Sequence, residues 1–157
     1  MRGSGRAFLI AATALFVAAV TPSAEAAIGL TKVTDLVFGD LTAGATAGTV
    51  RIGPGGARSR TGGVTLLAST FDNASFTVST PSGSRNYTII LPGSATLTSG
   101  GGFTMTVDTF TSNPSGSGRT AAGTLMQTLN VGATLHVSAN QRPGTYSGTF
   151  TVTVIQN

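Results

Sequence analysis

The chain of 157 residues contains no cysteine and no tryptophan, and its only glutamate is Glu25. The absence of cysteine excludes disulfides, thiolate metal sites and cysteine nucleophiles, so stability must come from the core of the fold. A hydrolytic carboxylate pair would have to be drawn from four aspartates, namely Asp35, Asp40, Asp72 and Asp108. Asp72 lies in a Phe-Asp-Asn turn and Asp40 directly follows Gly39. Both are therefore predicted to hydrogen-bond to the backbone in turns.

The single histidine, His136, lies between Leu135 and Val137. If those two side chains point into a core, strand alternation points His136 outward, together with Thr134 and Ser138. No second metal ligand lies near it in the sequence, and no G-x-S-x-G motif supplies a triad serine. The glycine-rich stretches match neither a phosphate-binding loop nor a calcium loop. We therefore expect that the protein is not an enzyme and has no catalytic residue, metal site or cofactor.

The N-terminus has the three parts of a signal peptide. Arg2 and Arg6 precede an apolar run over 7–20, and an Ala-Glu-Ala pattern over 24–26 fits the site that signal peptidase cleaves. The apolar run is shorter than the roughly 20 residues that a membrane-spanning helix needs. We predict a signal peptide over 1–26 rather than an anchor. No later segment is continuously apolar, so no transmembrane segment is expected in the mature chain.

Cleavage after residue 26 would leave 131 residues, 27–157, which suit a single domain. A signal peptide predicts a secreted protein, located in the periplasm, at the cell surface or outside the cell. The mature chain has seven basic and four acidic residues, a net charge of +3. Its basic residues are scattered, apart from Arg58 and Arg60, whereas nucleic-acid binding needs a basic patch. We expect no nucleic-acid partner.

Apolar and polar residues alternate along the mature chain, which is rich in threonine and valine, and this pattern is typical of half-buried strands. Glycine and proline clusters separate the alternating runs. We predict an all-β fold, an antiparallel β-sandwich of about eight to ten strands, with a closed barrel as the alternative. The predicted strands are 28–38, 49–52, 62–69, 74–80, 86–91, 95–99, 103–107, 125–131, 133–138 and 146–154.

Three local predictions accompany these strands. Strands 74–80 and 86–91 are separated by a Pro-Ser-Gly turn and are expected to be neighbours. The stretch 113–123 is rich in glycine and serine and is predicted to be a flexible loop. Phe71 and Phe110 fit the apolar alternation least well, so they are candidates for an exposed aromatic patch.

Several stretches resemble a family of secreted bacterial domains known as domain of unknown function 4402. They are LVFG (36–39), TGGVTL (61–66), ASFTV (74–78), MTVDTF (105–110), VGATL (131–135) and PGTYSGTFTVTV (143–154). The Gly-Thr-Tyr-x-Gly-Thr pattern in the last stretch is also similar to spore-coat-U and chaperone-usher pilus subunits. This second resemblance implies an immunoglobulin-like sandwich and surface assembly. The chain departs from those subunits in lacking cysteine and in having Gln156 where pilins have a penultimate tyrosine.

These observations favour a non-enzymatic structural or adhesive protein of the cell surface, with a pilus-like filament subunit as one form of it. The alternative is a carbohydrate- or protein-binding module of the cell envelope. For self-association, the hypothesis is that residues 27–35 act as a donor strand, because Ile28 and Leu30 fall on one face. The final strand, 146–154, would receive it. The competing interpretation is that 28–38 is simply the first strand of its own sandwich.

Overall fold

The structure, a computed structural model, describes residues 28–121 and 125–157. The predicted signal peptide over 1–26 lies outside the described residues. The described part confirms an all-β fold with antiparallel sheets arranged as a sandwich. No helix in these residues has the length and apolar character needed to cross a membrane.

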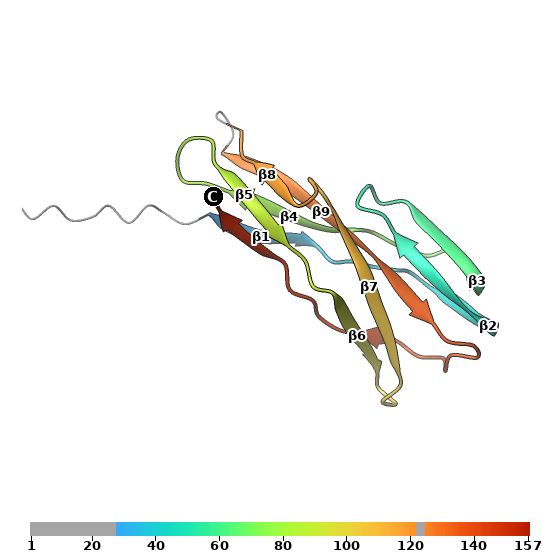
Figure 1. Ribbon diagram of the computed structural model, residues 1–157. Coiled ribbons are helices and arrows are strands. Elements are labelled where there is room, and N and C mark those ends of the chain that lie inside the picture. The colour runs from blue at the N-terminus through green and yellow to red at the C-terminus, as the bar shows by residue number, and fades with distance from the viewer. Residues whose placement is uncertain (1–27, 122–124) are drawn as a thin grey trace, which may run out of the picture.

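Eleven strands make up the described fold (Figure 1). They are β1 (Gly29–Thr34), β2 (Leu41–Ile52), β3 (Arg58–Leu66), β4 (Ala74–Ser79), β5 (Asn86–Ile90), β6 (Ser94–Ser99), β7 (Thr104–Asn113), β8 (Ser117–Arg119), β9 (Met126–Val137), β10 (Tyr146–Ser147) and β11 (Thr153–Gln156). The large sheet has the order β1-β4-β9-β7-β6-β10, and β2 joins it through β9 and carries β3. The small sheet has the order β11-β5-β8.

Strand β9 is the centre of the large sheet. Along one edge it pairs with β4 over Met126–Val131 and then with β2 over Ala133–Val137, while β7 pairs with the opposite edge. From Leu129 to Val137 its inward side chains alternate and are buried. The sequence predicted a break between 131 and 133, but β9 is continuous. Gly132 is a point of close approach to the backbone of Ile52 and Gly53, where a Cβ atom would clash.

Two clusters of buried side chains form the core. One contains Val50, Ile52, Val107 and Leu135 and lies on the inner face of β2, β7 and the second half of β9. The other contains Tyr87 and the side chains that β4 and the first half of β9 point inward. The small sheet covers this second cluster, since Val152 and Val154 also pack against it.

The prediction that 74–80 and 86–91 are neighbouring strands is wrong, because β4 belongs to the large sheet and β5 to the small one. The segment between them crosses from one sheet to the other and is held by the buried Thr120. The hydroxyl of Thr120 accepts a hydrogen bond from the backbone N–H of Arg85 at 3.0 Å, and its carbonyl accepts one from the hydroxyl of Ser84 at 2.6 Å. These contacts pair the polar groups of Thr120, which is fully buried.

Several predicted boundaries also differ from the structure. The predicted loop 113–123 contains β8, which is too short to show alternation and pairs with β5. The predicted strand 146–154 is split, since β10 pairs with β6 in the large sheet and β11 pairs with β5 in the small sheet. At the N-terminal end, β1 stops at Thr34 and β2 begins at Leu41, earlier than predicted.

Replacing Leu129 with alanine should lower the free energy of unfolding by about 2–5 kcal/mol, because Leu129 is fully buried at the centre of the fold. Its exposed neighbour Thr128 provides the control, and Thr128→Ala should change that free energy by less than about 0.5 kcal/mol. Urea unfolding of residues 27–157 measures both values. Equal effects of the two substitutions would contradict the assigned faces of β9.

Candidate functional site

A cleft of about 1230 Å³ lies on the inner face of the large sheet, over the half that the small sheet does not cover. Its floor is apolar and is formed by inward side chains of β6, β7 and β9, namely Ala95, Leu97, Met105, Val107 and Leu135. Its two walls are the segments 35–43 and 141–150. The cleft is therefore a place where the sandwich has only part of its second layer.

Side chains of Arg58 and Ser69 hold the wall 35–43 through hydrogen bonds to backbone groups. The guanidinium of Arg58 donates to the carbonyl oxygens of Asp40 at 2.6 Å and Leu67 at 3.1 Å, and the backbone N–H of Asp40 donates to the hydroxyl of Ser69 at 2.6 Å. Gly39 has a φ of 73°, a conformation that favours glycine. Burial lowers the pKa of Arg58, while the charge of Asp40 acts in the opposite direction. This wall is thus fixed to β3 and to the residues that follow it.

The wall 141–150 is anchored at its first turn. The hydroxyl of Tyr146 donates to the carbonyl oxygen of Arg142 at 2.7 Å and accepts from the side-chain amide of Gln141 at 2.8 Å. After β10, residues 148–152 belong to no strand. Phe150 nevertheless packs on Phe110 at 5.1 Å between ring centroids. The wall therefore combines a fixed turn with an extended segment outside both sheets.

The two phenylalanines predicted as a candidate patch have different environments. Phe71 is exposed and lies under the guanidinium of Arg58, 5.4 Å from the ring centroid. Phe110 is partly buried and packs against both core clusters, so it is not part of a surface patch. Phe103, which the sequence did not single out, is exposed and lies 5.5 Å from the guanidinium of Arg142.

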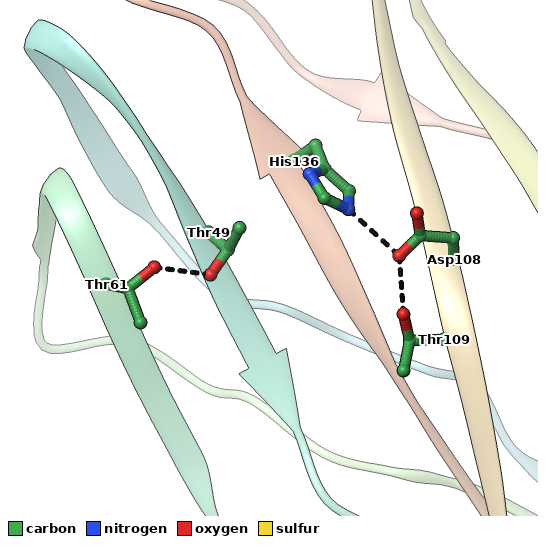
Figure 2. A network of polar contacts seen from close by, with 5 residues as sticks. All are labelled: Thr49, Thr61, Asp108, Thr109 and His136. Carbon is green, nitrogen blue, oxygen red and sulfur yellow. Dashed lines mark hydrogen bonds and ion pairs between the residues drawn. The ribbon is translucent and has the colours of Figure 1, made fainter.

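His136 faces outward from the opposite side of the large sheet, as predicted, while Leu135 and Val137 are buried. The Nε2 atom of His136 lies 2.9 Å from a carboxylate oxygen of Asp108, and the hydroxyl of Thr109 donates to the same oxygen at 2.9 Å (Figure 2). The hydrogen bonds from His136 and Thr109 outweigh desolvation and lower the pKa of Asp108. Sequence reasoning missed this pair because His136 and Asp108 are brought together only by the register of β7 and β9.

The other aspartates do not join this pair. Asp35 forms an exposed ion pair with Lys32 at 2.7 Å. The carboxylate of Asp72 accepts from the backbone N–H of Asn73 at 2.8 Å, which confirms its predicted role in a turn. Asp40 acts instead through its backbone groups. Within 28–121 and 125–157, no three of the His, Cys, Asp and Glu residues are grouped as metal ligands would be.

The fold is that of an all-β sandwich domain in which the small sheet covers only part of the large one. The family described as domain of unknown function (DUF4402) matches residues 28–155, and the chain belongs to this family. No curated protein and no solved structure matches the chain.

The Asp108 interaction should make stability depend on pH in the acid range. A lowered pKa means that the ionised carboxylate stabilises the folded state above the ordinary value of 3.8, and that this stabilisation is lost as the pH falls through the folded-state pKa. Urea unfolding at a series of pH values should show wild type more stable than Asp108→Asn near neutrality, with the difference disappearing in acid. Thr109→Ala, which removes one of the two hydrogen bonds, should show a smaller difference. A difference that does not vary with pH would contradict this account.

Proposed function

We propose that this chain is a secreted, non-enzymatic structural or adhesive protein of the bacterial cell surface, and that its copies associate by β-strand addition. The observation that carries the proposal is the cleft, because it combines an apolar floor with extended walls. An added strand gains affinity from main-chain hydrogen bonds and specificity from pockets for alternate side chains. Residues 148–152, which lie outside both sheets, are the part of the predicted receiving segment 146–154 that could pair with such a strand.

The predicted donor segment lies at the start of the described chain. Residues 29–34 form β1, which pairs with β4 of the same copy, as the competing interpretation expected. However, β1 is the edge strand of the large sheet, so only one of its edges is paired within the described fold. Ile28 and Leu30 are only partly buried against the second cluster. In the proposed assembly, β1 leaves β4 and enters the cleft of the next copy.

Such an exchange would add copies one after another in one direction. Donor and acceptor are different parts of the surface, so each copy can receive one strand and donate another. A heterologous contact of this kind builds filaments unless its rotation closes a ring. This geometry supports a pilus-like subunit. The GTYSGT stretch (144–149), for which we noted a resemblance to pilus subunits, lies in one wall of the cleft.

The absence of cysteine allows a direct cross-linking test of the proposal. The double variant Thr31→Cys with Thr149→Cys puts one thiol on β1 and one on the cleft wall. On oxidation, the concentrated mature chain should give a ladder of covalent oligomers in a denaturing gel. Only monomers from this variant would argue against strand addition.

The matched control is Thr31→Cys with Thr77→Cys. These residues lie directly opposite each other in β1 and β4, within the Cα separation that a disulfide requires. Oxidation of the dilute protein should close this bond within one copy and hold β1 in its own sheet. The locked protein should then remain monomeric at concentrations where the mature chain associates. Oligomers from the locked protein would mean that copies associate without releasing β1.

A further inference from the structure

The outer face of the large sheet, opposite the cleft, carries two rows of polar side chains across β6, β7, β9, β2 and β3. Residues paired directly across strands point to the same face of a sheet. The first row is Thr96, Thr106, His136, Thr49 and Thr61, in successive strands. None of these five side chains is apolar, and all of them are exposed or half-exposed. We call the surface formed by the two rows the hydroxyl face.

The second row runs beside the first and contains its charges. It consists of Ser94, Asp108, Thr134, Arg51 and Ser59. Asp108 and Arg51 lie on either side of Thr134, two strand spacings apart, or roughly 9.5 Å. The hydroxyl face therefore holds one carboxylate and one guanidinium with a hydroxyl between them. The carboxylate and the guanidinium have opposite charges, which cancel.

Some hydrogen-bonding groups of this face are held in place by their neighbours, and others are available to a ligand. One oxygen of the Asp108 carboxylate is fixed by His136 and Thr109, which leaves its second oxygen available to accept from a ligand. The guanidinium of Arg51 forms no hydrogen bond or ion pair with any residue that the structure describes. The hydroxyls of Thr49 and Thr61 are bonded to each other at 2.7 Å (Figure 2).

A hollow of about 410 Å³ lies on this face, beside Thr49 and His136. It is lined by Ala47, Gly48, Thr49, His136, Val137 and Ser138. It is a shallow, open depression rather than an enclosed pocket. Gly48 pairs with the buried Val137, and β3 approaches its backbone too closely for a Cβ atom. The hollow thus offers an imidazole and two hydroxyls beside the carboxylate of Asp108.

We propose that the hydroxyl face binds a neutral polysaccharide, with one sugar ring in the hollow beside His136. A sugar hydroxyl both donates and accepts, so it suits a surface that alternates carboxylate, hydroxyl and guanidinium groups. The absence of net charge favours a neutral chain over an acidic one. No aromatic side chain belongs to the two rows, so affinity depends on hydrogen bonds from several rings. This inference does not rest on strand addition, because the cleft is on the other face.

Titration of the ¹⁵N-labelled mature chain with neutral hexasaccharides tests the proposal. The probes are cellohexaose, chitohexaose, maltohexaose and mannohexaose, with hexagalacturonic acid as the acidic comparison. At millimolar concentration, at least one neutral probe should shift the amide signals of Thr49, Thr106, Thr134 and His136. Absence of shifts with every neutral probe, binding of hexagalacturonic acid alone, or shifts confined to the cleft walls would overturn it.

Two variants and a control separate binding from stability. Asp108→Ala and Arg51→Ala should each weaken binding of the active probe by about tenfold, the effect of losing a hydrogen bond to a charged group. Thr128→Ala, on the same face of β9 but outside both rows, should leave the affinity unchanged. Thermal unfolding of each variant confirms that it is folded at the titration temperature. Unchanged affinity in both folded charge variants would also overturn the proposal, whereas the cross-linking result would be unaffected.

Discussion

Strand β9 is paired along both edges and contributes buried side chains to both core clusters. Because the sequence has no cysteine, no covalent link can replace this strand in holding the two halves of the fold together. Leu129 and Val131 belong to the cluster under the small sheet, and Leu135 and Val137 belong to the other. The remaining strands of the large sheet are attached to β9 directly or through β4, β2 and β7. The continuous strand β9 therefore sets the positions of both the cleft and the hydroxyl face.

The two halves of β9 are covered differently. The small sheet lies over the first half, but the second half is covered by the segments 35–43 and 141–150, which include only short or partial strands. Extended chain outside a ladder leaves backbone donors and acceptors available for pairing. Around the second half of β9, the large sheet has the apolar cleft on its inner side and the hydroxyl face on its outer side. The two proposals assign a strand of another copy to the cleft and a hydroxylated ligand to the outer face.

Alternation along the sequence was enough to predict most strands, including β4 and β5 to within one residue, and the outward direction of His136. It could not predict the sheet to which a strand belongs. The alternation over 146–154 is uninterrupted, yet its two ends pair with β6 and β5 in different sheets. The Asp108–His136 pair was missed for the same reason, because cross-strand register depends on long-range pairing that a single strand does not encode.

The proposed assembly requires that the backbone of residues 148–152 is free to pair with a strand from another copy. Amide hydrogen exchange of residues 27–157 at low and high protein concentration measures this most directly. We expect rapid exchange over 148–152 in the dilute protein and strong protection in the concentrated protein, while the amides of β9 remain protected in both. Exchange over 148–152 that is the same at both concentrations would contradict it.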